Sequence, residues 1–301
     1  MSIRRWIEGA LLGLMAGSVQ ADPCHAALAR FDYEQAMHLS AAAPESAAAG
    51  LCAARAAYET GQFVRAMNEL RKVESGQPPG EMRTYLYNWL TVTLRKLGHE
   101  QEAMQYGRAA LAWARIEPNR QNLATALHNL AGLTASAGDR HAALALYRES
   151  IPLNPDLSER SASLNNVGLL FQAAGEWAAA ESWMQAAIEL NRAENHFHHL
   201  GKHLMNLGNL YRALGRYSLA QRHLEDGAAL IEQAHDDYWK AVAMRYSGWL
   251  ARDMGDRVTA RDRLHEAERR YEATGARQDA VATRAEWQAI QGVLSRTKSG
   301  K

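Results

Sequence analysis

Histidines gather between Asn195 and His203. His199 and His203 are four residues apart, so a helix would present both on one face, and His196 would lie one turn earlier if the helix reached back to it. Imidazole nitrogens at this spacing can hold Zn²⁺, Cu²⁺ or Ni²⁺. No cysteine or H-E-x-x-H motif accompanies them, and the Lys202 ammonium would disfavour a cation. We therefore assign no metal site and keep the three histidines as weak candidates, since histidines near a helix start are more often surface or partly packed side chains.

The sequence has two cysteines, Cys24 and Cys52. Neither is placed like a nucleophile, and no C-x-x-C motif suggests metal binding or redox exchange. In an oxidising compartment two cysteines favour a disulfide, which would join the elements at the N-terminal end of the chain. The alternative is a pair of buried free thiols.

The first residues are typical of a secretory signal. Arg4 and Arg5 precede a short apolar run, residues 11–17, and a V-x-A cleavage pattern that ends at Ala21. The apolar run is too short for a membrane-spanning helix. We predict a signal peptide over residues 1–21 and a periplasmic or secreted mature protein without membrane insertion. An ordinary amphipathic first helix is the alternative.

Composition and missing motifs exclude several classes of protein. The chain has 301 residues, 47% of them hydrophobic, and a formal net charge of +1, which gives no reason to expect a basic face for nucleic acid. The motifs G-x-x-x-x-G-K-[ST] and G-x-S-x-G do not occur. We therefore expect no catalytic residues, no cofactor and no nucleic-acid partner, and the chain is not expected to be an enzyme.

A repeat must position these side chains. In the stretch Leu204–Gly227, small or apolar residues such as Gly208 and Tyr211 form one helical stripe, and Ala220 belongs to a second stripe after a glycine. Each copy predicts a helix–turn–helix hairpin, and a fixed period of this size indicates stacked units. The turn glycines are spaced 37, 40, 37, 40 and 40 residues apart: Gly61, Gly98, Gly138, Gly175, Gly215 and Gly255.

The repeats organise most of the chain. Alanine is abundant, and none of the 7 prolines follows Pro155, so we expect an all-helical protein. About seven hairpins, the first of them truncated, would occupy residues 22–276. One unpaired helix over residues 277–295 would cap the exposed end, as a stack of repeats requires. Residues 296–301 would form a flexible tail.

The pattern L-G-x-x-Y-x-x-x-G-x-Y-x-x-A-x-x-x-L at residues 207–224 resembles the tetratricopeptide repeat. The resemblance covers roughly residues 24–275, although Thr91 replaces one small residue and a charged residue replaces the second aromatic in three copies. The period exceeds that family's roughly 34 residues, and longer repeats with N-L-G-N are similar to those of kinesin light chains. The resemblance implies an all-α fold, a right-handed superhelical α-solenoid of stacked hairpins with a C-terminal capping helix.

The resemblance also implies that the first helices of the hairpins line a concave groove that binds another protein. Asparagine can both donate to and accept from a peptide backbone, and arginine pairs with carboxylates. We therefore predict a groove for a partner segment, which an acidic segment or a C-terminal carboxylate would suit; solvated polar side chains on a helix face are the alternative. The predicted groove residues are Arg95, His128, Asn129, Asn166, Lys202, Asn206, Asn209, Arg212, Arg245, Trp249 and Arg252.

The expected function is that of a non-catalytic protein-binding scaffold or assembly factor in the bacterial periplasm. Two alternatives remain open. One is a metal-binding protein that uses the cluster from His196 to His203, and the other is a structural accessory subunit of an envelope enzyme or secretion complex. The sequence leaves the oligomeric state undetermined.

Overall fold

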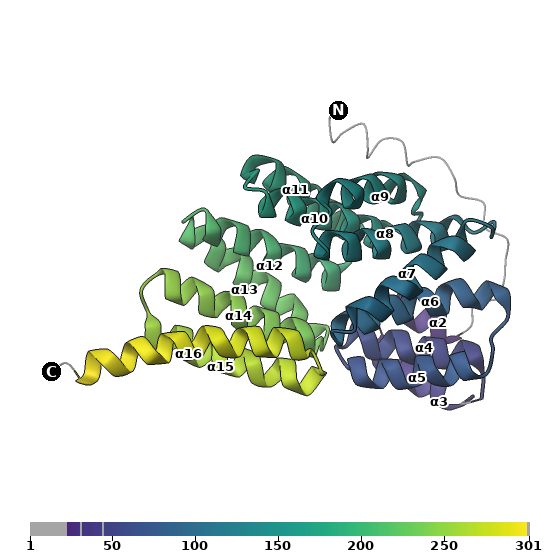
Figure 1. Ribbon diagram of the computed structural model, residues 1–301, viewed down its shortest axis with the longest axis horizontal. Helices are drawn as coiled ribbons and strands as arrows, with labels where there is room; N and C mark the ends of the chain where they lie inside the picture. The colour runs from purple at the N-terminus through teal and green to yellow at the C-terminus, as the bar shows by residue number, and fades with distance from the viewer. Residues whose placement is uncertain (1–22, 31, 44, 300–301) are drawn as a thin grey trace. The chain divides into compact units, whose positions relative to one another are not determined.

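The computed structural model describes residues 23–30, 32–43 and 45–299 (Figure 1). The predicted signal peptide and its cleavage position after Ala21 lie outside these residues. The described residues form fifteen α-helices, α2 to α16, and no strand. The all-α fold predicted from the repeats is confirmed. No helix in this part of the chain is both long and apolar enough to cross a membrane.

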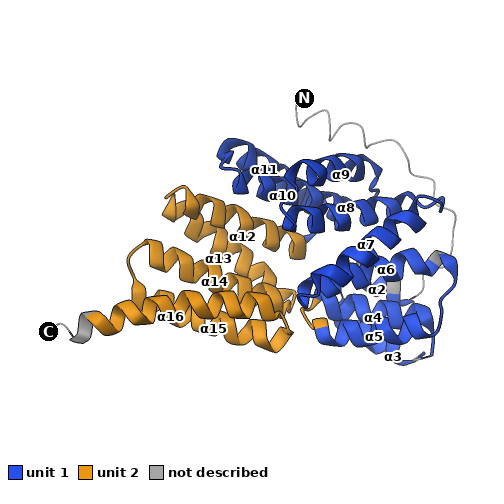
Figure 2. Cartoon of the chain, viewed as in Figure 1, with its two compact units in different colours: residues 1–59, 64–196 blue, residues 60–63, 197–301 orange. Residues whose placement is uncertain are grey.

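The helices fall into two compact units, residues 1–59 with 64–196 (unit 1) and residues 60–63 with 197–301 (unit 2) (Figure 2). Unit 1 contains α2 (Pro23–Ala29), α3 (Tyr33–Ala41), α4 (Ala47–Glu59), α5 (Phe63–Ser75), α6 (Gly80–Lys96), α7 (Glu100–Ala114), α8 (Arg120–Ser136), α9 (Arg140–Leu153), α10 (Leu157–Ala173) and α11 (Trp177–Ala193), with Phe63 itself assigned to unit 2. Unit 2 contains α12 (Phe197–Ala213), α13 (Tyr217–Gln233), α14 (Asp237–Asp253), α15 (Arg257–Thr274) and α16 (Arg277–Ser299).

The six hairpins from α4–α5 to α14–α15 each turn at a glycine of the repeat. At Gly215 the φ angle is +71°, in the left-handed region that favours glycine. The Gly215 N–H donates to the Arg212 carbonyl at 3.0 Å, and the Arg216 N–H donates to the Tyr211 carbonyl at 2.9 Å. These bonds satisfy the last carbonyls of α12 and direct the chain into α13. The turn glycines therefore end the first helix of a hairpin.

The two helices of a hairpin approach closely because small residues face each other. A Cβ atom on Gly208 would lie 3.1 Å from the carbonyl oxygen of Ala220, and one on Gly227 would lie 2.7 Å from the carbonyl oxygen of Gly201. Tyr211 is buried beside this contact. Gly208, Ala220 and Tyr211 therefore pack α12 against α13, as the sequence predicts. This packing explains their spacing in the sequence.

Buried stripes orient the first helices within each unit. In α6, Leu86, Leu90 and Leu94 recur every fourth residue and pack in one core cluster with Leu133 of α8. In unit 2, a cluster that includes Leu264 joins α14, α15 and α16. Since these stripes fix the rotation of each helix, the polar residues one position to either side of them are held along a neighbouring face.

The last helix, α16, packs on α15 through apolar and polar contacts. The Trp287 indole N–H donates to Glu268 at 2.5 Å, and Arg284 pairs with both Glu268 and Glu272. The helix begins at Arg277 and continues to Ser299, into the segment that the sequence predicts as a flexible tail.

Cys24 of α2 and Cys52 of α4 meet in the buried core at the N-terminal end of unit 1. Their Cα atoms are 6.3 Å apart, a separation that a disulfide can bridge. The two residues are 28 positions apart in sequence, so a bond between them would enclose α3 and residues 47–52 of α4.

Candidate binding face

The first helix of each hairpin carries polar side chains at fixed distances before its turn glycine. Asn88, His128 and Arg245 lie ten positions before the glycine of their repeat, and Arg95 and Arg212 lie three positions before it. We call the predicted groove residues together with Asn88 the inner row. In unit 1 the inner row lies on α6, α8 and α10, and in unit 2 it lies on α12 and α14.

Two asparagines form a buried amide pair in unit 1. Asn129 Nδ2 donates to Asn88 Oδ1 at 3.3 Å, and the two side chains are only 8% and 3% exposed. Asn88 Nδ2 is buried and has no hydrogen-bond partner among the described residues. A buried donor without an acceptor costs about 1–3 kcal/mol. Asn88 therefore carries an unmet hydrogen bond inside the contact between α6 and α8.

His128 is held as a neutral imidazole. Its Nδ1 bonds to Ser163 Oγ at 2.7 Å, and its Nε2 lies 3.5 Å from Asn166 Nδ2. The Tyr147 ring packs edge-on against it. Burial and, after it, the positive charge of Arg95 lower the pKa of His128 to about 4. At neutral pH His128 accepts a hydrogen bond from Asn166 and contributes no charge to the inner row.

Arg95 lies over the backbone of α8. A Cβ atom on Gly132 would come within 2.5 Å of one Arg95 guanidinium nitrogen and 3.5 Å from the Tyr147 hydroxyl, so the missing side chain leaves room for the cation. Among the described residues, no group forms a hydrogen bond or an ion pair with the Arg95 side chain. The inner row of unit 1 thus presents one uncompensated guanidinium.

In unit 2, unlike at Arg95 of unit 1, the cations of the inner row are paired with carboxylates. Arg245 donates to Glu286 of α16 through both Nε and Nη2, at 3.3 and 2.6 Å, and lies 3.5 Å from Asp279. The Trp249 indole N–H donates to the same Glu286 carboxylate at 2.8 Å. The guanidinium carbons of Arg245 and Arg212 lie 4.8 and 5.3 Å from the centre of the Trp249 ring. These contacts join α12, α14 and α16.

The remaining cations of this row also have carboxylate partners. Arg212 pairs with Asp253 of α14 and donates from Nε to Asn209 Oδ1 at 2.8 Å. Lys202 Nζ lies 3.1 Å from Asp236, and Arg252 lies 3.0 Å from Asp253. Asn206 accepts a hydrogen bond from Tyr246 at 3.3 Å.

The carboxylates that neutralise unit 2 were missed in the sequence. The predicted groove residues did not include Asp236, Asp279 or Glu286, and these three carboxylates pair with cations of the inner row in unit 2. Asp279 and Glu286 lie on α16, which has no turn glycine to set its register. Asp236 precedes α14 and caps this helix, since it accepts from the Trp239 N–H at 3.0 Å.

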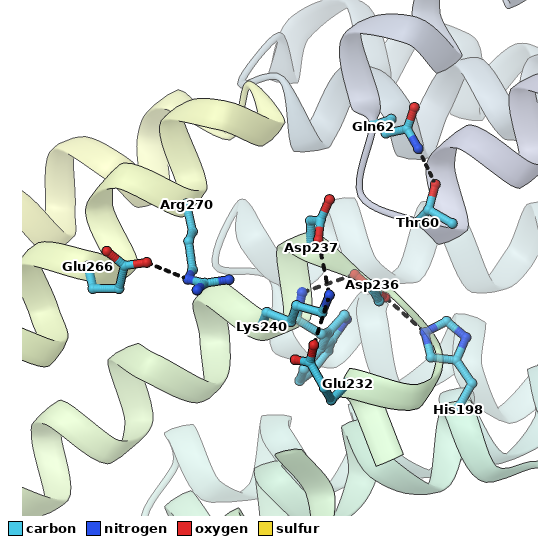
Figure 3. A network of polar contacts seen from close by, with 10 residues as sticks. Thr60, Gln62, His198, Glu232, Asp236, Asp237, Lys240, Glu266 and Arg270 are labelled. Atoms are coloured by element: carbon cyan, nitrogen blue, oxygen red, sulfur yellow. Dashed lines mark hydrogen bonds and ion pairs between the residues drawn. The ribbon is translucent and has the colours of Figure 1, made fainter. Parts of the chain in front are cut away.

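Of the predicted histidine cluster, His199 and His203 lie four residues apart on α12, with their ring centres 6.3 Å apart. α12 begins at Phe197, so His196 lies outside it. His203 is buried, and burial followed by the charge of Lys202 lowers its pKa to about 3. His198, which was not a candidate, has a carboxylate partner, since its Nε2 lies 2.9 Å from Asp236 Oδ2. Figure 3 shows this ring directed at the carboxylate.

Asp236 is fully buried in this cluster. Burial alone would raise its pKa, but the Lys202 ammonium and the hydrogen bond from His198 bring it down to about 2. Nearby on the surface, Lys240 pairs with Glu232 at 3.5 Å and Asp237 at 3.4 Å (Figure 3). This arrangement uses His198 and Lys202 to hold a helix cap, and metal binding gains no support from it.

The sequence and the fold were compared with known proteins. Two models of the tetratricopeptide repeat match residues 123–153 and 159–233. The Photosystem I assembly protein Ycf3 of Synechococcus sp. (strain CC9311) is 28% identical over 120 residues, which are 40% of this chain and 66% of that protein. The match thus spans slightly less than two thirds of that relative.

Solved structures share the fold at low sequence identity. A Rap protein complexed with Competence and Sporulation Factor has 14% identity and a TM-score of 0.62, with 93% of this chain and 89% of that chain covered. The Rap conjugation gene regulator of the plasmid pLS20, in complex with the Phr* peptide, has 17% identity and a TM-score of 0.64, with 89% and 73% covered. The repeat models identify tetratricopeptide repeats at residues 123–153 and 159–233, and the solved structures show that the chain shares the fold of such proteins.

Proposed function

We propose that this protein is a non-catalytic scaffold or assembly factor that holds a segment of another protein against the inner row of unit 1. Asn88, Asn129, Asn166 and Arg95 would make the contacts. The polar residues of unit 2 would instead stabilise its own hairpins, because each of its inner-row cations already has a carboxylate partner.

The observation that carries this proposal is the unsatisfied Asn88 amide. Its Nδ2 group is buried beside the Asn129 side chain without an acceptor among the described residues. A stable monomer gains nothing from a buried donor that lacks a partner. A partner segment that opens the contact between Asn88 and Asn129 would bring a peptide carbonyl to this donor. The hydrogen bond would then contribute to affinity.

The relatives are consistent with a protein-binding role. The Synechococcus relative is described as a Photosystem I assembly protein, and the two Rap structures are complexes with Competence and Sporulation Factor and with the Phr* peptide. Such repeats present extended surfaces to partners of many kinds, so the fold supports binding in general and does not select the partner.

The proposal is tested by capture of partners with the full chain from an extract of the source cells. Asn88→Leu combined with Asn129→Leu replaces the amide pair by apolar groups of similar size, so the fold should persist while the hydrogen bonds to a partner are lost. Gln185→Leu on the exposed face of α11 is the matched control. Equal recovery of the same proteins by the double variant and the control would refute a role for this face.

We also propose that the protein is exported to the periplasm, with cleavage after Ala21 and a Cys24–Cys52 disulfide. The charged and apolar pattern of the first residues and the 6.3 Å separation of the two Cα atoms support this. N-terminal sequencing of the protein from a periplasmic fraction should start at Asp22, and thiol labelling should modify neither cysteine before reduction. Recovery of the uncleaved chain in the cytoplasm with two reactive thiols would overturn both statements.

A further inference from the structure

The outer face of the last helix, α16, is apolar. A helix that ends a repeat stack normally turns a polar face to water. In α16 six uncharged residues are exposed on one side instead, and we call them the outer strip: Val281, Ala282, Ala285, Ala289, Gly292 and Val293. Val281 is 64% exposed and Val293 is 41% exposed. The strip covers about 18 Å of helix, so it is a continuous surface and not a single exposed side chain.

The other side of α16 already has its partners. Ala280, Thr283 and Ile290 are buried against the rest of unit 2. Ile290 and Trp287 pack in the cluster that contains Leu264 of α15. The outer strip is therefore what remains after the helix has docked on its own unit, and it stays exposed among the described residues.

Gly292 has no structural role within its own chain. A Cβ atom there would meet nothing within 4 Å, whereas Gly201, Gly208 and Gly227 of the same unit each lie against another helix. Glycine inside a helix is less stable than alanine, and α16 continues beyond Gly292 to Ser299. A single chain gains nothing from this glycine, but a second helix can approach closely where the side chain is missing.

The side-chain sizes along the strip are the same from both ends. Val281, Ala285, Ala289 and Val293 recur every fourth residue, with the large side chains outside and the small ones between them. A second α16, laid antiparallel about a two-fold axis midway between Ala285 and Ala289, would place each of these alanines against the other. The same axis would place Val281 of one copy at Gly292 of the other. A two-fold contact requires such a self-complementary surface.

Charges beside the strip do not oppose a second copy. Arg284 pairs with Glu268 and Glu272 of α15. Glu286 pairs with Arg245 of α14. Because both charged side chains are held by their own chain, two copies that meet at the outer strip would bring neutral surfaces together.

We infer that the outer strip of α16 is a homodimer interface, at which two copies of this chain pack their last helices antiparallel. One helix from each copy makes a contact at the small end of the range of specific interfaces, so we expect a dissociation constant on the order of 10 µM. A dimer does not depend on the proposed function, but it would carry two inner rows and so two places for a partner segment.

The test is sedimentation equilibrium of the full chain at concentrations from about 1 to 200 µM, which bracket the expected constant. The variants are Ala285→Arg and Ala289→Glu, each of which adds a charge to the strip. Ala229→Arg, on an exposed position of α13, is the matched control. Circular dichroism shows whether each variant keeps its helices.

Wild type and Ala229→Arg should dimerise with the same dissociation constant. Ala285→Arg alone and Ala289→Glu alone should each weaken dimerisation at least about tenfold, because two like charges meet near the two-fold axis. An equimolar mixture of these two variants should recover dimers, since the added guanidinium of one chain then faces the added carboxylate of the other. A wild type that stays monomeric over the whole range, undiminished association of folded Ala285→Arg, or a mixture no stronger than its components overturns the inference and leaves the proposed scaffold intact.

Discussion

Arg212 of α12 is bonded to Asp253 of α14, one hairpin further along the chain. The two residues are 41 positions apart, close to the repeat length, so the pair joins equivalent faces of consecutive hairpins. Arg245 and Glu286 are also 41 positions apart, and their contact joins α14 to α16 in the same way. Polar residues that the repeat brings to one face can therefore stabilise the stack itself, and this use has to be distinguished from recognition of a partner.

Replacing Glu286 by glutamine tests whether these ion pairs between neighbouring hairpins stabilise unit 2. The change removes the charge that Arg245 and the Trp249 indole N–H share, while the shape of the side chain is kept. We expect the free energy of unfolding of unit 2 to fall by about 1–2 kcal/mol, because the pair is mostly withdrawn from water. Urea unfolding followed by tryptophan fluorescence measures this.

The control for that change is Arg252→Gln. Arg252 is 44% exposed and pairs with its own sequence neighbour, so its loss should alter the free energy of unfolding by less than about 0.5 kcal/mol. If Glu286→Gln were as mild as this control, the contacts between α14 and α16 would be incidental to stability.

A glycine pair in unit 2 tests the close helix approach. A Cβ atom on Gly227 would lie 2.7 Å from the Gly201 carbonyl oxygen and 2.6 Å from Met205 Cγ, whereas one on Gly292 of α16 would meet nothing within 4 Å. Gly227→Ala should therefore destabilise by about 1–3 kcal/mol through overpacking. Gly292→Ala should stabilise by up to about 1 kcal/mol, since alanine favours a helix. Thermal unfolding of both variants measures these effects. Equal melting temperatures for the two variants would contradict the close helix approach at Gly227.

The fold was predictable because its signals are local and repeated. Gly215 and its five equivalents mark the turns inside six hairpins, and Gly208 and Ala220 mark the helix contact, so one register serves most of the chain. The face beside the stripe was predictable for the same reason. What the register could not supply was the partner of each polar group. Glu286 comes from a helix outside the repeat, and both His198 and His199 fit a helix start equally well until packing selects His198 for Asp236.

Buried histidine predicts a pH dependence of stability. His203 has a pKa of about 3 in the fold, against about 6.5 in an unfolded chain, so the unfolded state binds the proton between these values. The associated stability is complete above pH 6.5 and is lost progressively as the pH falls toward 3. Between pH 7 and pH 4 the free energy of unfolding should drop by about 2–3 kcal/mol from this group.

The variant His203→Gln isolates that contribution, since glutamine does not titrate. Its free energy of unfolding is expected to vary less between pH 7 and pH 4 than that of wild type, although His128 continues to contribute in both. Identical pH profiles of urea unfolding for the two proteins would show that His203 is not buried in its neutral form.

Hydrogen exchange read by mass spectrometry, with and without a bound partner segment, tests the central claim most directly. Wild type is first used to isolate the segment, which is then added in excess to the full chain. If the segment lies along the inner row of unit 1, amides of α6 and α8 gain protection, while those of α13 and α15 in unit 2 are unchanged. Protection confined to the second helices of the hairpins, or to unit 2 alone, would contradict binding at Asn88, Asn129 and Arg95.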